Sequence, residues 1–277
     1  PIRLGQEFLG YAGQVERARR RCAEALNALE ELPLGGTAVG TGVGAHPEFA
    51  HRVIMRIGEI TGIPFRETEN HFCAQSTIDA VVAGSGALRA VAIAMFVIAN
   101  DIRLLGCGPR AGIGEIAIPA VQPGSSIMPG KVNPVICESV TMVAAQVMGN
   151  DATVAFSGAA GSLLELNVMM PVAAHAILES IALLASSARN LATQCVDGIS
   201  ATDNGPALVE RGLMLTTALA PAIGYDNAAA IAKEALNTGR TIRDVARERT
   251  QLSDDELNHI LNPEAMTEPG LGVAAGG

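Results

Sequence analysis

The stretch AVAIAMFVIAN, residues 90–100, is apolar on nearly every face that a helix could present. It belongs to a longer helical pattern that runs from about Ala74 to Leu105. A helix that is apolar all round is buried on all sides, so this one belongs inside a bundle or between subunits. Aromatic residues make up only 3% of the chain, and small aliphatic side chains allow helices to approach closely. We therefore expect an all-α fold built on a long-helix bundle.

Other segments of the chain also carry helical patterns. Long helices are predicted over residues 6–31, 47–62, 133–156 and 163–196, the last interrupted at Pro171. Shorter and more highly charged ones are predicted near residues 204–218, 226–237, 241–249 and 253–261. No strand pattern competes with them. These patterns predict a central helical-bundle domain over 1–198, a small C-terminal helical domain over 199–270 and a disordered tail over 271–277.

Composition narrows the classes of function. The chain of 277 residues has a net charge of −9, which disfavours nucleic-acid and anionic-membrane partners because such binding needs clustered Lys and Arg. The five cysteines are far apart in the sequence and form no C-x-x-C pair, and no two histidines share a helix face at metal-ligand spacing. No charge-free apolar run approaches the roughly 18 to 20 residues that span a bilayer. We expect a soluble cytoplasmic protein with neither cofactor nor metal.

A long loop is predicted between two of the bundle helices, over residues 106–133. It is rich in Pro and Gly, and it is longer than compact domains usually tolerate without a functional reason. Asn133 followed by Pro134 is a typical helix start, with Asn as the N-cap and Pro at the first helical position. The loop therefore leads into a helix N-terminus.

The end of this loop reads GSSIMPGKVNP, residues 124–134. It places the hydroxyls of Ser125 and Ser126 within a few residues of Lys131, one of only two lysines in the chain, and of Asn133. Hydroxyls, a cation, an amide and the N–H groups of a helix terminus together suit a carboxylate ligand. Glu138, about one turn into the helix, is either an ordinary acidic residue near a helix start or a carboxylate that orients a histidine.

These residues resemble the signature loop of the fumarase/aspartase superfamily, GSSxMPxKxNP, at every signature position. Similarity to class II fumarases extends over nearly the whole chain. The matching segments are GGTAVGTG (35–42), HPEFA (46–50), SGALR (85–89), IANDIR (98–103), GPRAGIGE (108–115), QVMGND (146–151), ELNV (165–168) and IGYDNAA (223–229). The closing NPEAMTEPG is similar as well.

The resemblance implies a lyase of the fumarate hydratase type, which reversibly adds water to fumarate to give malate. It implies a homotetramer whose long helices form a central bundle and whose sites are shared between subunits. Ser125 would remove the C3 proton of malate. The substrate carboxylate would be bound by Ser126, Lys131, the backbone of Val132, and Asn133. Glu138 would pair with a histidine that activates water.

In the family that histidine precedes the segment similar to PIRLGQE, residues 1–7, and none of the five histidines of this sequence matches it. The family's N-terminal domain, with its substrate loops, has no counterpart here either. Cys73 and Gly44 stand where fumarases usually carry Glu and Asn, and GSLLELNV is one residue longer than the family pattern. Two alternatives therefore stay open: an aspartate ammonia-lyase, which shares the loop chemistry, and a helical scaffold without activity.

Overall fold

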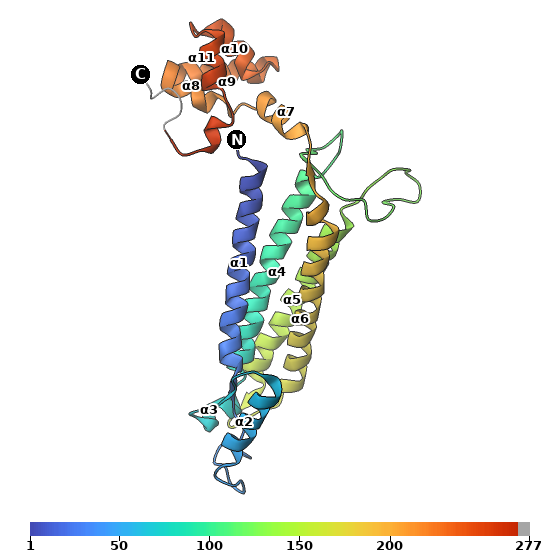
Figure 1. The fold of residues 1–277 in the computed structure, drawn as a ribbon, viewed down its shortest axis with the longest axis vertical. Coiled ribbons are helices and arrows are strands. Elements are labelled where there is room, and N and C mark those ends of the chain that lie inside the picture. The colour runs from blue at the N-terminus through green and yellow to red at the C-terminus, as the bar shows by residue number, and fades with distance from the viewer. Residues whose placement is uncertain (271–277) are drawn as a thin grey trace. The chain divides into compact units, whose positions relative to one another are not determined.

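A computed structural model of the chain describes residues 1–270. Helices dominate it (Figure 1), so the predicted all-α fold is confirmed. The helices are α1 (Leu4–Leu29), α2 (Phe49–Thr61), α3 (His71–Ser76), α4 (Asp79–Leu105), α5 (Val135–Ala160), α6 (Met170–Gln194), α7 (Asn204–Arg211), α8 (Thr216–Ile223), α9 (Tyr225–Thr238), α10 (Ile242–Arg249) and α11 (Asp254–Ile260), with 3₁₀ turns η1 (Val196–Gly198) and η2 (Ala265–Thr267). The tail predicted over 271–277 lies outside the described residues.

The chain forms two compact units, which we describe separately. The bundle unit comprises residues 12–103 and 119–198. The terminal unit comprises residues 1–11, 104–118 and the chain from Ile199 on. The domain boundary predicted after residue 198 stays a prediction.

In the bundle unit, α1, α4, α5 and α6 run side by side (Figure 1). Their contact faces are built from small and medium apolar residues. Those buried on α4 include Ala92, Ala99 and Ile102, and those on α5 include Val140, Ala144, Val147 and Val154. Neighbouring members of these sets are three, four or seven residues apart, which places them on one face of each helix, and their small volume lets the backbones approach. The opposite face of α4, with Ile93 and Val97, is exposed. The all-round burial expected for this helix therefore does not occur within one chain.

The bundle unit also corrects several predicted boundaries. The helix predicted from Ala74 is two helices, α3 and α4, separated at Thr77. The helix predicted from residue 163 begins only at Met170, and Pro171 lies in its first turn, where a proline is tolerated because its missing N–H is not needed. The residues before it form an antiparallel hairpin, β4 (Ser162–Leu163) with β5 (Leu166–Asn167).

Short strands were missed elsewhere too. β1 (Glu31–Leu32) pairs in parallel with β2 (Arg66–Glu67), and β3 (Ile116–Ala117) pairs antiparallel with β6 (Ser200–Ala201). Each strand has two residues, too few to show the alternation of apolar and polar positions on which strand prediction depends.

The terminal unit has an apolar core supplied by α8 to α11. Its fully buried side chains are Leu215, Leu219, Ile242, Val245, Ala246, Leu257 and Leu261. The helix predicted over 204–218 is divided into α7 and α8, because the chain leaves the helix at Gly212 in an extended conformation. Thr241 caps α10, and Ser253 with Glu256 forms a capping box on α11.

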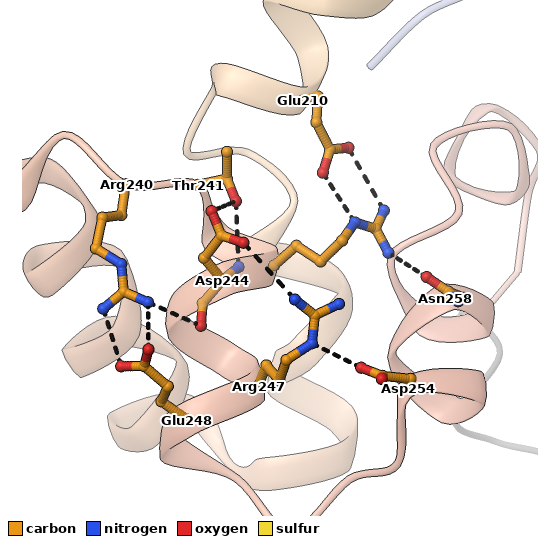
Figure 2. Close-up of polar contacts among 9 residues, drawn as sticks. Glu210, Arg240, Thr241, Asp244, Arg247, Glu248, Asp254 and Asn258 are labelled. Atoms are coloured by element: carbon orange, nitrogen blue, oxygen red, sulfur yellow. Dashed lines mark hydrogen bonds and ion pairs between the residues drawn. The ribbon is translucent and has the colours of Figure 1, made fainter.

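Arginines on α10 and next to it link the helices at the surface of this core (Figure 2). Arg240 contacts Glu248 at 2.6 Å, and Arg247 contacts Asp254 at 2.7 Å. Arg243 contacts Glu210 of α7 at 2.8 Å. The pairs of Arg240 and Arg247 are exposed and each adds little stability, and only the Arg243–Glu210 pair is partly buried, so the buried leucines dominate the energetics of the unit.

Two helical segments within residues 1–270, Asp79–Leu105 and Met170–Gly198, are long and apolar enough to cross a membrane when up to two charged residues are allowed. Length and composition are weak grounds for a membrane span, because core helices of soluble proteins meet the same criterion.

Candidate active-site loop

The signature loop, which we define as residues 124–134, lies in the bundle unit and leads into α5. Figure 1 shows it leaving the helices near the start of α5. The predicted cap is wrong: Pro134, not Asn133, occupies the N-cap position, and no side chain caps the helix there. The amide of Asn133 is used elsewhere, because its Nδ2 donates to the carbonyl of Gly124 at 2.8 Å.

That hydrogen bond closes the neck of the loop. A second one lies beside it, from Gly124 N to Lys131 O at 2.9 Å. A Cβ on Gly124 would meet Lys131 O at 2.4 Å and Asn133 N at 3.0 Å. Only glycine allows the two arms of the loop to approach this closely. The sequence GSS therefore begins with glycine for a packing reason.

A tight turn presents the lysine. Lys131 N donates to Met128 O at 3.3 Å, and the two residues between them are Pro129 and Gly130, the latter with a φ of +78°. Pro at the second and Gly with positive φ at the third position are typical of a type II turn. The Pro-Gly pair therefore fixes the direction in which the chain reaches Lys131.

Ser125 lies at the start of the loop and is half-buried. Its Oγ accepts hydrogen bonds from the backbone N–H groups of Ile127 and Met128, both at 3.2 Å. Two N–H dipoles directed at one oxygen stabilise negative charge on it. Ser126, the next residue, is exposed. The loop thus provides Ser125 with the kind of surroundings that a serine acting as a base requires.

The charged candidates have no partner within the chain as far as the structure describes it. Lys131 and Val132 are exposed, and the Lys131 ammonium makes no ion pair with residues 1–270. Glu138 is half-buried in the first turn of α5, and its carboxylate likewise has no hydrogen bond or ion pair among these residues. Both charges remain available to a ligand or to residues outside the described chain.

Sequence reasoning missed one pair of reactive groups close to this loop. Cys137, which precedes Glu138, lies 3.8 Å from Cys195 when measured between the two Sγ atoms. The contact with Cys137 lowers the pKa of the Cys195 thiol, whereas the same contact and burial raise the pKa of Cys137. Because 58 residues separate the two cysteines, no spacing pattern could have paired them.

A second polar group in the bundle explains part of the motif QVMGND. Asp151 is buried on α5, and its carboxylate contacts Ser85 Oγ at 2.7 Å and Arg89 Nη1 at 2.6 Å, both on α4. These contacts satisfy a carboxylate that would otherwise be costly to bury. Within residues 1–270, no group of three or more His, Cys, Asp or Glu side chains is placed to hold a metal ion.

Comparison with known families identifies the chain. A family model described as lyase matches residues 1–149, and a second, described as fumarase C C-terminus, matches residues 215–268. The chain belongs to the lyase family. The resemblance to class II fumarases seen in the sequence is confirmed, because similar proteins include a fumarate hydratase class II of Methylorubrum extorquens, 52% identical over 270 residues, and one of Rhizobium meliloti, 50% identical over 270 residues.

Solved structures of this lyase family agree. A crystal structure of a cobalt-bound fumarate lyase:delta crystallin from Brucella melitensis matches 97% of the chain with a TM-score of 0.93 and 45% identity. A class II fumarase from Schistosoma mansoni matches 96% with a TM-score of 0.92 and 35% identity. The match covers 58% and 59% of those two chains. The matches to the Methylorubrum and Rhizobium relatives each cover 97% of this chain, which spans 57% and 58% of the length of those two proteins.

Proposed function

We propose that this chain provides the signature loop and helical bundle of a class II fumarate hydratase, a lyase that interconverts fumarate and malate. The observation that carries the proposal is the loop itself. Within ten residues it holds a serine oxygen that accepts two backbone N–H groups and a lysine ammonium without a partner among the described residues. The relatives named fumarate hydratase class II support the choice of reaction.

The chemistry requires both groups. The C3 proton of malate is weakly acidic, and its removal leaves an aci-carboxylate with two negative charges on one end of the substrate. Ser125 would take that proton, because the N–H groups of Ile127 and Met128 stabilise its alkoxide. Lys131 would supply a fixed positive charge where the negative charge develops.

The remaining loop residues would bind the substrate carboxylate. Ser126 offers an exposed hydroxyl and Val132 a backbone N–H. Asn133 donates one N–H of its amide to Gly124, which leaves the second N–H for a ligand. Glu138 would orient a histidine from another part of the protein, since its carboxylate has no partner within residues 1–270.

We also propose a homotetramer in the cytoplasm, with the bundle domain over 1–198 at its centre. The bundle helices leave large apolar side chains exposed, among them Leu26, Met142, Phe156 and Leu178. Surfaces of this kind mark places where protein chains associate. The substrate would be a small dicarboxylate, and the site would be shared between subunits.

The test is the absorbance of fumarate formed from malate or from aspartate by the purified protein. We expect malate to react when the part of the protein that supplies the histidine is present. Lys131→Ala should lower the rate by about 10²- to 10³-fold, comparable to removing a donor from an oxyanion site. Lys233→Ala, which removes the only other lysine from an exposed position on α9, is the matched control and should leave the rate unchanged.

Other outcomes would overturn parts of the proposal. Turnover of aspartate without malate would make the protein an ammonia-lyase. Near-normal rates for Lys131→Ala would remove the lysine from the mechanism. A tetramer without turnover of either substrate would support a scaffold instead.

A further inference from the structure

Two of the five cysteines touch each other inside the bundle unit. Cys137 is the third residue of α5, and Cys195 is the C-cap residue of α6. Neither side chain has any exposed surface, and the two Sγ atoms are 3.8 Å apart. Both cysteines are in the free form. The contact joins the end of one long helix to the beginning of another.

We propose that Cys137 and Cys195 form an oxidisable dithiol, at which hydrogen peroxide closes a disulfide. The inference rests on this contact and not on the proposed hydratase activity. The bond would fix the first turn of α5, which follows the signature loop and carries Glu138, to the last turn of α6. It would therefore restrict the motion of the N-terminus of α5, to which the signature loop is directly connected.

The positions of the two cysteines allow the bond to form. A disulfide needs a sulfur separation of about 2.05 Å, so the two atoms must approach by somewhat less than about 2 Å. Both residues lie at helix ends, where the backbone adjusts more easily than in a helix interior. Cys195 is followed directly by the 3₁₀ turn η1, and its own φ and ψ of −126° and −67° are already outside the helical range.

The chemistry assigns different roles to the two thiols. The pKa of Cys195 is lowered by its contact with Cys137, so Cys195 supplies the thiolate. Its sulfur attacks one peroxide oxygen, the O–O bond breaks, and the departing hydroxide takes a proton to leave as water. The sulfur of Cys137 then attacks the resulting sulfenic acid. The S–S bond forms, the S–O bond breaks, and the Cys137 proton leaves with the oxygen as a second water. Two thiols are oxidised and one peroxide is reduced to two waters.

Burial selects the oxidant. Because neither sulfur has exposed surface, any oxidant needs a local opening of the helix ends, and hydrogen peroxide, little larger than water, needs a smaller opening than a bulky disulfide such as oxidised glutathione. The other cysteines differ in this respect: Cys73 is exposed, and Cys22 and Cys107 are half-buried. None of these three has a thiol partner among the described residues.

The experiment treats the chain of residues 1–277 with a small excess of hydrogen peroxide, blocks the remaining thiols by alkylation in denaturant, and measures intact mass and digested peptides. We expect a species about 2 Da lighter than the reduced chain before alkylation, with three alkylated cysteines instead of five. A peptide pair linking Cys137 to Cys195 should appear without reductant and disappear with it. Cys73→Ser, the exposed control, should behave like the wild type.

Cys137→Ser should abolish the mass loss and leave a sulfenic acid on Cys195, seen as a gain of about 16 Da that a sulfenic-acid probe traps. The proposal is overturned if peroxide leaves both buried cysteines alkylatable while Cys73 is oxidised. It is also overturned if the linked peptides join other cysteines. Because the wild-type peptide map decides these outcomes, the test remains valid even if the serine variant folds poorly.

Discussion

The helices of the terminal unit enclose a compact apolar core within the chain, although Tyr225 and Leu236 on α9 stay exposed, whereas the bundle helices leave many of their large apolar side chains exposed. Leu215 and Leu257 have 1% or less of their surface exposed, but Met142, Phe156 and Leu178 on the bundle have 63% to 66% exposed. Exposed apolar area of this kind contributes nothing to folding until something covers it. The terminal unit therefore has its own apolar core, and the exposed apolar faces of the bundle would add stability only if the proposed association covers them.

Charged side chains form ion pairs in both units, for example Arg89 with Asp151 in the bundle, but the signature loop differs from them. In the terminal unit, Arg243 contacts Glu210 and Asn258, and Arg247 contacts Asp254 (Figure 2). In the signature loop, the ammonium of Lys131 has no such contact within residues 1–270. Paired charges hold neighbouring helices together, while an unpaired one is free to bind a ligand. This contrast is what the proposed role of Lys131 predicts.

The largest effect expected from this contrast is at the core of the terminal unit. Leu219 is fully buried among α8 to α11, so Leu219→Ala leaves a cavity as well as removing apolar contacts. We expect a loss of about 2–5 kcal/mol in the free energy of unfolding, measured by urea denaturation.

Leu178→Ala on α6 is the matched control, because the same side chain is 63% exposed there. It should change the unfolding free energy of the monomer by less than about 0.5 kcal/mol while weakening self-association in sedimentation experiments. Equal destabilisation by the two variants would contradict the conclusion that Leu219 contributes to a core within the chain while Leu178 does not.

A smaller effect is expected at the capping box of α11. Ser253 Oγ accepts from Glu256 N at 3.3 Å, and Ser253 N donates to the Glu256 carboxylate at 2.7 Å. Ser253→Ala should cost about 1 kcal/mol in the unfolding free energy. Ser186→Ala on α6 is the control, since that hydroxyl only donates to carbonyls of its own helix. A cost at Ser186 that matches the cost at Ser253 would refute the cap as the cause.

Periodicity predicted the helices well and their ends poorly. The helical pattern that contains the apolar run 90–100 placed the end of α4 correctly at Leu105, but its predicted start at Ala74 joined α3 and α4 into one helix. Pro171 was misread as an interruption, since a proline in the first turn of a helix and one in its interior differ only in where the helix begins. The two-residue strands are too short to leave a pattern.

The loop was recognised from sequence because its residues are contiguous. Ser125 and Lys131 could be picked out by residue type and by the turn residues between them. The contact of Asn133 with Gly124 was missed, because an Asn before a proline is equally typical of a helix cap. The pairing of Cys137 with Cys195 depends on how α5 packs against α6, which no local pattern encodes.

A further, local loss of stability is expected at the neck of the signature loop, where Asn133 donates to the carbonyl of Gly124. Asn133→Asp keeps the shape of the side chain but replaces the donor Nδ2 with an oxygen that repels the carbonyl of Gly124. Losing this hydrogen bond should cost about 1 kcal/mol locally. The amide of Gly124 should then exchange with deuterium roughly 5-fold faster, because a hydrogen bond of this kind contributes that order of protection. Trypsin should also cleave faster after the exposed Lys131.

Asn190→Asp on α6 is the control for this variant, because Asn190 contacts only Gln194 on the same exposed helix surface. It should leave Gly124 exchange and cleavage after Lys131 unchanged. The unfolding of the terminal unit should be the same in both variants. Unchanged exchange at Gly124 in Asn133→Asp would show that the amide does not close the neck.

The smallest effect is at an ion pair on the surface of α1, where Arg19 and Arg20 both contact Glu16. Their hydrogen bonds lower the pKa of the Glu16 carboxyl from 4.5 to about 2. Because the folded pKa lies below the unfolded one, the pair stabilises the helix above pH 4.5, and this contribution is lost as the pH falls toward 2. Solvent and salt screen so exposed a pair, so the change in helix stability should be small. A carbon-13 NMR titration should place the midpoint of Glu16 near 2, and replacing both arginines with Ala should return it toward 4.5. A midpoint near 4.5 in the unaltered chain would mean that the two arginines do not stay close enough to Glu16 to stabilise its carboxylate. Glu16 would then lack a stable partner within the chain, as the exposed apolar side chains of the bundle do.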